Sequence, residues 1–416
     1  MSISRLALLT SLTVALVTGC GGGDGVTVPE EDGSTPDSGS GLDATIDSGK
    51  KDGTVDPDSG QPPSELDATL DIGFPDVFTV PDSSVVIEAG ADGGCSPNGV
   101  SCTGAVANTC TNGTFSQTNC ALQGKQCADG FGCVTCVPGT GSCSGSTGTL
   151  CKSDGSGYVQ NLCDPLLGLS CNAGVCSGAC ANVGQSYIGC DYYAVTTSNP
   201  ALNQSVFNAS IAVANTGSAT ATLTVTGPSN FNQTYTVPAG AVQEVTIPWV
   251  PAISNTYATV RTNGAAYRVR STQPVTVYQF NARDYQKSGT FSYTNDASLL
   301  LPVNAMTGNY WVAAMPDWNY GSQHYPGTIT IVGTQDNTSV TFTASNPVQA
   351  GSGVSSTGSS SVTLNRGDVL EIMSALNAPA NATYGLDISG SRVVASAPVE
   401  VFGGSTCSFV PANVGY

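Results

Sequence analysis

The sequence predicts an all-β protein with a duplicated antiparallel β-sandwich-like head, preceded by a disulfide-rich tandem module and a disordered acidic linker. Three observations predict this organisation. Beyond about residue 185, short runs alternate apolar and polar side chains and end at Gly, Asn or Pro. Fifteen of the sixteen cysteines lie at or after Cys95. Only 10% of the residues are charged, which is typical of an extracellular β-protein and not of a helical enzyme.

The first nineteen residues have the pattern of an export signal. One positive charge at Arg5 precedes the apolar run Leu6–Val17, which is shorter than the about 20 residues that span a bilayer. The run ends in "VTGC", which resembles a bacterial lipobox. We therefore expect a lipoprotein signal peptide over 1–19 and lipidation at Cys20. The alternative is an ordinary signal peptide with a chance cysteine. Because Gly21 follows Cys20, we expect an outer-membrane or cell-surface location.

Residues 20–94 are predicted to form a disordered tether that is rich in Gly, Ser, Pro and Asp. From Asp24 to Asp92 the chain has seventeen acidic residues against two lysines, so this segment has a net charge of 2 − 17 = −15. Little apolar surface is available to offset chain entropy, and the repelling carboxylates favour an extended chain. Calcium binding by Asp52, Asp56 and Asp58 is the alternative, but the glycine and distal glutamate of an EF-hand loop are missing.

Residues 95–180 contain two similar six-cysteine units. Both begin with the spacing C-x6-C-x7-C, and "NGVSCTGAVANTC" parallels "GTGSCSGSTGTLC". An even number of cysteines in an exported chain predicts disulfides, and six cysteines allow fifteen connectivities that the sequence leaves open. A zinc site at Cys133-x2-Cys136 is the alternative. The expected disulfide cysteines of the two units are Cys95, Cys102, Cys110, Cys120, Cys127 and Cys133, and then Cys136, Cys143, Cys151, Cys163, Cys171 and Cys176.

The remainder, residues 181–416, reads as one β domain made of two similar units near 187–290 and 325–416. The hairpin-like stretch "ASIAVANTGSATATLTVTG" returns as "GTITIVGTQDNTSVTFTAS", and "STQPVTVYQF" returns as "ASAPVEVFGG". Pro274 and Pro398 occupy equivalent positions in the last pair. Strands of five or six residues with polar turns favour a sandwich, and a propeller is the alternative.

The sequence contains no recognisable catalytic pattern. The chain has one histidine, His324, and lacks a Gly-x-Ser-x-Gly elbow. No basic patch is present that could bind nucleic acid, and neither a metal site nor a cofactor is expected. In the run "NYWVAAMPDWNYGSQHY" we expect Trp311 to be a core residue. The loop residues that could contact a ligand are Trp318, Tyr320, His324 and Tyr325.

Several stretches together resemble the IgGFc-binding protein N-terminal domain family over roughly residues 185–416. They are "YIGCDYYAV", "VTVYQFNA", "NDASLLLPVNAMTGNYWVAAMP", "LNRGDVLEI" and "APVEVFGGSTC". The complete arrangement resembles myxobacterial surface lipoproteins. The resemblance implies a non-enzymatic cell-surface lipoprotein that binds extracellular proteins or glycans in adhesion or cell contact. The alternatives are a secreted carbohydrate-active enzyme or esterase, and a structural envelope or matrix protein.

The family continues beyond "VPANVGY" with a further cysteine, so the resemblance also implies a truncated C-terminus. Without Cys20 the cysteine count is odd. We therefore expect Cys180 to pair with Cys190 and Cys407 to have lost its partner, with a Cys190–Cys407 bridge as the alternative.

Overall fold

The computed structural model describes residues 87–90, 94–295, 297–320, 323–376 and 384–408. The predictions for the signal peptide, for Cys20 and for most of the tether lie outside these residues. The described part is all-β, as predicted. Its helical elements are short: α1 (Pro251–Ser254) and the 3-10 turns η1 (Cys120–Gln123), η2 (Pro165–Leu167) and η3 (Pro228–Asn230). Among the described residues, none of the helices has the length and apolar character needed to cross a membrane.

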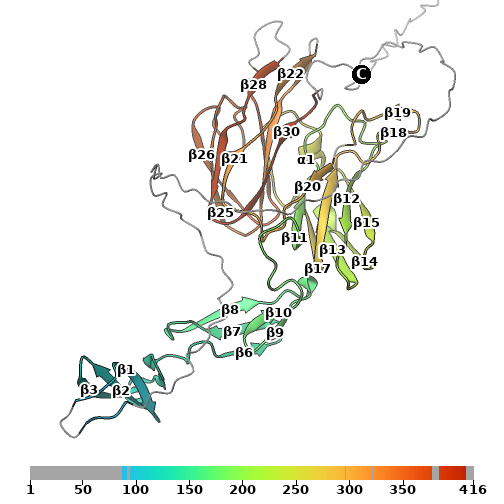
Figure 1. Ribbon diagram of the computed structural model, residues 1–416. Helices are drawn as coiled ribbons and strands as arrows, with labels where there is room; N and C mark the ends of the chain where they lie inside the picture. The colour runs from blue at the N-terminus through green and yellow to red at the C-terminus, as the bar shows by residue number, and fades with distance from the viewer. Residues whose placement is uncertain (1–86, 91–93, 296, 321–322, 377–383, 409–416) are drawn as a thin grey trace, which may run out of the picture. The chain divides into compact units, whose positions relative to one another are not determined.

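Residues 95–176 form two small units with the same strand plan (Figure 1). Each unit has a three-stranded antiparallel sheet followed by a two-stranded hairpin. The first contains β1 (Gly99–Thr103), β2 (Val106–Thr111), β3 (Thr114–Asn119), β4 (Gln126–Ala128) and β5 (Gly132–Val134). The second contains β6 (Gly141–Ser144), β7 (Thr147–Cys151), β8 (Tyr158–Leu162), β9 (Ser170–Asn172) and β10 (Val175–Ser177). The 3-10 turns η1 and η2 occupy equivalent places, each ending at a glycine in the left-handed conformation, Gly124 and Gly168.

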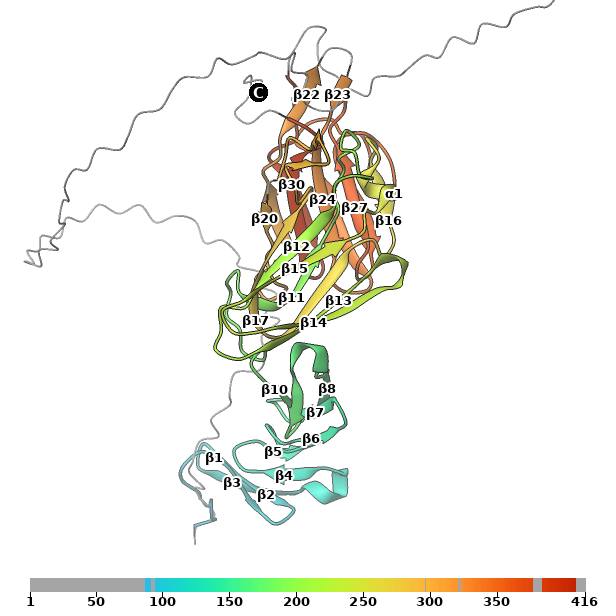
Figure 2. The same cartoon turned by 90° about the vertical axis from the view of Figure 1, so that its right-hand side faces the viewer.

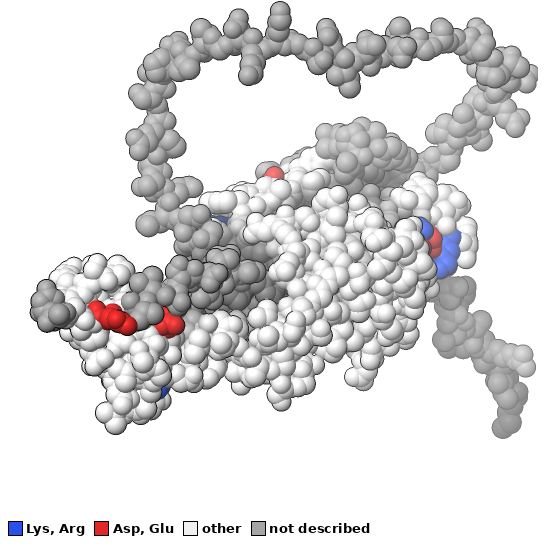
Figure 3. Space-filling view, turned by 60° about the horizontal axis from the view of Figure 1, so that its bottom comes forward, with Lys and Arg blue, Asp and Glu red and all other residues white. Residues whose placement is uncertain are grey.

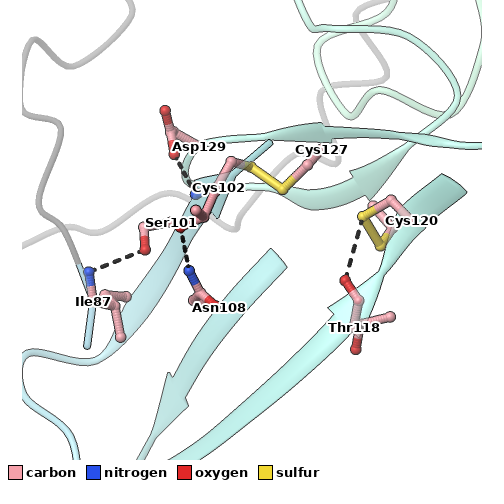
Figure 4. The surroundings of a disulfide bond; sticks show 10 residues. Ile87, Ser101, Cys102, Asn108, Thr118, Cys120, Cys127 and Asp129 are labelled. Atoms are coloured by element: carbon pink, nitrogen blue, oxygen red, sulfur yellow. Dashed lines mark hydrogen bonds between the residues drawn. A yellow bond between two sulfur atoms is a disulfide. The ribbon is translucent and has the colours of Figure 1, made fainter. Parts of the chain in front are cut away.

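The disulfides of the two units follow one connectivity, which joins the first cysteine to the third, the second to the fifth and the fourth to the sixth. The bridges of the first unit are Cys95–Cys110, Cys102–Cys127 and Cys120–Cys133. Those of the second are Cys136–Cys151, Cys143–Cys171 and Cys163–Cys176. Figure 4 shows the Cys102–Cys127 bridge beside Asp129, whose carboxylate accepts from the Cys102 backbone N–H at 2.7 Å. The structure thus selects one of the fifteen connectivities and uses it twice.

A seventh bridge joins Cys180 to Cys190, as expected. Cys407 is also disulfide-bonded, and none of the described cysteines is free. The expectation that Cys407 had lost its partner is therefore wrong.

The first β-unit, residues 189–299, is a sandwich whose two sheets share the long strand β17 (Tyr267–Phe280). Its first half pairs with β11 (Gly189–Ala194) and β13 (Ala221–Gly227), and β14 (Phe231–Val237) lies beyond β13. Its second half pairs with β12 (Ala209–Ala214) and β20 (Ala297–Leu299), and β15 (Val242–Ile247) lies beyond β12. The change of partners falls around Pro274, which has no backbone N–H to donate to a ladder.

The second β-unit, residues 309–405, repeats this topology. One sheet has the order β27 (Val369–Met373), β24 (Gly327–Gly333) and β30 (Val399–Ser405), and β16 (Val260–Thr262), from the range of the first β-unit, pairs with the outer edge of β27. The facing sheet has the order β21 (Asn309–Val312), β29 (Ser391–Ala395), β25 (Thr338–Thr343) and β26 (Ser359–Leu364). Strands β29 and β30 correspond to the two halves of β17, and Pro398 lies in the break between them. A further short sheet has the order β23 (Gln323–Tyr325), β22 (Pro316–Tyr320) and β28 (Tyr384–Asp387). In the sequence, β22 and β23 fall between β21 and β24, and β28 falls between β27 and β29.

Each β-unit has a core filled from both of its sheets, which is the arrangement of a sandwich and not of radial propeller blades. The first core includes Ile211, Leu223 and Val277, and the second includes Ile331, Phe342 and Leu370. Val332 and Val369 of the second β-unit belong to the first core. The sheet that carries β24 is therefore covered on both faces, and every residue of β24 is buried. Figure 2 shows β12, β13, β15 and β17 next to the sheet of β24, β27 and β30, and Figure 1 shows β30 on the side of that sheet nearest these strands.

Candidate binding site

A groove of about 870 Å³ lies where the two β-units meet. It is lined by three stretches that are far apart in the sequence: 197–203 after β11, 285–294 around the hairpin of β18 (Gln286–Lys287) and β19 (Thr290–Phe291), and 402–408 at the end of β30. Its volume falls in the range of small-molecule sites, about 300–1,000 Å³. The sequence analysis did not identify this groove.

Three aromatic rings stand along the hairpin side of the groove. Tyr285, Phe291 and Tyr293 are 48%, 41% and 44% exposed. The Tyr285 and Phe291 centroids are 5.8 Å apart edge to face, and those of Phe291 and Tyr293 are 5.7 Å apart and stacked. Ser292 is buried between them and donates its hydroxyl to the Asp284 carbonyl at 2.7 Å. The rings are therefore held in place while much of their surface stays in solvent, which is the arrangement of aromatic anchors in binding surfaces.

The rest of the groove lining is uncharged and mostly polar, with Ala201, Leu202, Met315 and Phe402 as apolar members. The Asn281 amide donates to the Val195 carbonyl at 3.2 Å and to the Thr197 hydroxyl at 3.1 Å, which fixes the floor. The Gln279 side-chain oxygen accepts from the Val195 backbone N–H at 2.9 Å. The described residues that line the groove include Ser, Thr, Asn, Gln and Gly but no Asp, Glu, Lys, Arg or His. Figure 3 shows that charged side chains are also sparse on the face it presents. The groove thus offers hydrogen bonds without an acid–base pair.

Two carboxyl groups are buried on the face of the β24 sheet that meets the first β-unit. Glu371 Oε1 accepts from the backbone N–H of Ser198, a groove residue, at 2.9 Å and lies 3.4 Å from the Thr330 hydroxyl. Neither Glu371 Oε2 nor Glu400 Oε2 has a hydrogen-bond partner. Burial raises the pKa of Glu371 to about 8, and burial also raises the pKa of Glu400 well above its usual range. The contact between the β-units therefore favours the neutral form of both groups.

The aromatic residues that the sequence singled out lie elsewhere, and two of them are buried. Trp318 is 2% exposed and Tyr325 is 6% exposed. Their rings stack with centroids 5.0 Å apart on the paired strands β22 and β23. The expectation that both lie in an exposed loop is wrong, because this stretch forms a hairpin that packs its rings together. Tyr320 is placed on β22, and its side chain is outside the description.

His324 is exposed as expected, with Nδ1 2.5 Å from Asn319 Oδ1 and 3.9 Å from the buried carboxylate of Asp317. Burial raises the pKa of Asp317, while His324 lowers it. His324 does not line the groove.

Trp311 is the reverse case, because it was expected in the core and is 72% exposed. Strand β21 is an edge strand in which Val312 takes the inward position, so its neighbour points outward. The guanidinium of Arg392 lies 5.5 Å from the centroid of the Trp311 ring.

Seven disulfides between described residues and an all-β fold are typical of a disulfide-rich extracellular protein. Residues 296–416 match the family model described as IgGFc binding protein, so this part of the chain is similar to that family. The match covers the second β-unit, whereas the sequence resemblance was placed from about residue 185. No curated protein and no solved structure matches the chain.

Proposed function

We propose that the protein is a non-enzymatic cell-surface lipoprotein that binds extracellular proteins or glycans in adhesion or cell contact. The observation that carries this proposal is the groove with three half-exposed rings over an uncharged, hydroxyl- and amide-rich floor. Tyr, Ser, Gly and Asn are the residues that antibody paratopes use, because rigid aromatic rings supply contact area and small polar groups supply adaptable hydrogen bonds. The family match to residues 296–416 supports a binding role as well.

Binding by the mature, oxidised chain tests this proposal. A panel of surface glycans and extracellular proteins is applied to the immobilised chain, and it includes IgG Fc because the matched family is named for it. We expect at least one ligand to bind, and Phe291→Ala to weaken it by about tenfold or more, as removal of an aromatic anchor does. Trp311→Ala is the matched control, since it removes an exposed ring outside the groove. Hydrolysis of a chromogenic ester or glycoside without any binding would support the enzyme alternative.

The lipid anchor makes a separate prediction. If Cys20 is acylated, a diacylglyceryl group and an N-acyl chain should leave the mature protein tethered stably to a membrane. Intact mass measurement is expected to show a chain that begins at Cys20 and carries added lipid, and Cys20→Ser should release the protein from membranes. Detection of Met1 at the N-terminus of the purified chain would contradict the anchor.

A further inference from the structure

We propose that the groove takes an uncharged oligosaccharide, with its pyranose rings lying against the aromatic rings of Tyr285, Phe291 and Tyr293. This inference rests on the proposed binding function and names the chemical class of ligand for the same site. Three properties of the groove point to this class: its lack of charge, its unused hydrogen-bonding groups and the exposure of its aromatic rings.

The charge argument excludes ionic ligands. No described residue that lines the groove carries a formal charge, and the charged side chains near the hairpin are paired with one another. Lys287 Nζ lies 3.9 Å from Asp284, and Arg283 Nε lies 3.0 Å from Glu244. A sulfated glycan, a uronate or a strongly charged peptide would lose hydration in the groove without gaining a counter-charge.

The hydrogen-bonding argument excludes purely apolar ligands. Among the described residues, no protein partner occurs for the Asn199 carboxamide or for the hydroxyls of Thr290 and Ser298, all of which line the groove. Among the same described residues, the phenol hydroxyls of Tyr285 and Tyr293, which also line the groove, have no protein hydrogen-bond partner either. An apolar ligand would cover these groups without satisfying them, whereas sugar hydroxyls both donate and accept, so they can pair with an amide or with another hydroxyl.

The aromatic rings supply the remaining interaction. A pyranose ring has C–H groups on its faces, and covering an aromatic ring with such a face removes apolar area from water and adds dispersion contacts. The centroid of the Phe291 ring lies 5.8 Å from that of Tyr285 and 5.7 Å from that of Tyr293. They therefore form a continuous strip along which consecutive sugar units could lie.

The test measures binding of matched neutral and acidic tetrasaccharides to the mature, oxidised chain by calorimetry. The neutral probes are cello-, malto-, laminari-, manno- and chitotetraose, and the acidic probes are tetragalacturonate and a chondroitin sulfate tetrasaccharide. We expect one or more neutral probes to bind with an affinity that changes less than about twofold between roughly 0.05 and 0.5 M NaCl, because screening acts only on charge. We expect Phe291→Ala and Tyr293→Ala each to weaken binding by about tenfold.

Trp311→Ala is the matched control and should bind like the parent chain. A preference for the acidic probes, or binding of a protein that Phe291→Ala abolishes, would overturn the neutral-glycan inference and leave the groove as the binding site. If neither glycans nor proteins bind in a way that depends on Phe291 or Tyr293, the inference and the proposed function both fall. Circular dichroism of each variant confirms that loss of binding is not loss of fold.

Discussion

Replacing Glu371 by Gln is expected to stabilise the two β-units at neutral and alkaline pH and to leave their stability unchanged near pH 4.5. Glu371 is fully buried, and its partners are a backbone N–H and a hydroxyl, with no cation among them. Its pKa is raised from a usual value of 4.5 to about 8, mainly by burial. Gln keeps the size and the accepting oxygen of the neutral acid and cannot ionise.

The sign of the pH dependence follows from linkage. Between about pH 4.5 and 8 the folded protein keeps a proton on Glu371 that the unfolded chain has lost, so the free energy of unfolding falls as the pH rises. The contribution of this group is complete below about pH 4.5 and is lost as the pH passes through about 8. The shift corresponds to an effect on the order of 3–5 kcal/mol, or about 5 °C or more in the thermal midpoint of the β-units.

Calorimetric unfolding between about pH 4.5 and 9 measures the effect. Glu244→Gln is the matched control, because Glu244 is 44% exposed and pairs with Arg283 on the surface, where removal of a charge has little effect on stability. A Glu371→Gln variant that is less stable than the parent chain at pH 8 would show that the ionised carboxylate contributes to the contact between the β-units.

Removing the Cys102–Cys127 bridge by a double Cys→Ser change is expected to unfold the first cysteine-rich unit and to leave the β-units intact. The hydrophobic clusters of the described chain all lie within residues 192–402. The buried apolar residues of the first unit are mainly small or are cysteines themselves, such as Ala107, Cys110 and Cys120. Loss of one native bridge in so small a unit costs about 2–5 kcal/mol, which is comparable to the entire stability that a unit of this size can have.

Limited proteolysis followed by mass spectrometry measures this effect, with new cuts expected between residues 95 and 133 and an unchanged thermal midpoint for the β-units. Leu122→Ser in the same unit is the control, since Leu122 is 86% exposed and its side chain supports no core. Retained protection of residues 95–133 in the double variant would show that the backbone sheet holds this unit without the bridge.

The aromatic residues show why the candidate site could not be predicted from the sequence. Trp311 and Trp318 both lie in a stretch of mixed apolar and polar residues, and the sequence indicated the wrong one as exposed. Which face of a strand is buried depends on what packs against it, and a strand at a sheet edge can present a large ring to solvent. The rings of Phe291 and Tyr293 occur in "FSYTND", which reads as an ordinary turn-flanked strand.

The sequence by itself determined the all-β class, the repeated six-cysteine units and the repeated strand pattern around Pro274 and Pro398, because these depend on local alternation, turn residues and cysteine spacing. It favoured the Cys180–Cys190 pair, and the structure decided against the alternative Cys190–Cys407 bridge. Only the tertiary structure decided the disulfide connectivity within each unit, the burial of Glu371 and Glu400 and the groove. The groove joins residues 197–203, 285–294 and 402–408, and contacts across such separations depend on how two sandwiches pack, which no local pattern encodes.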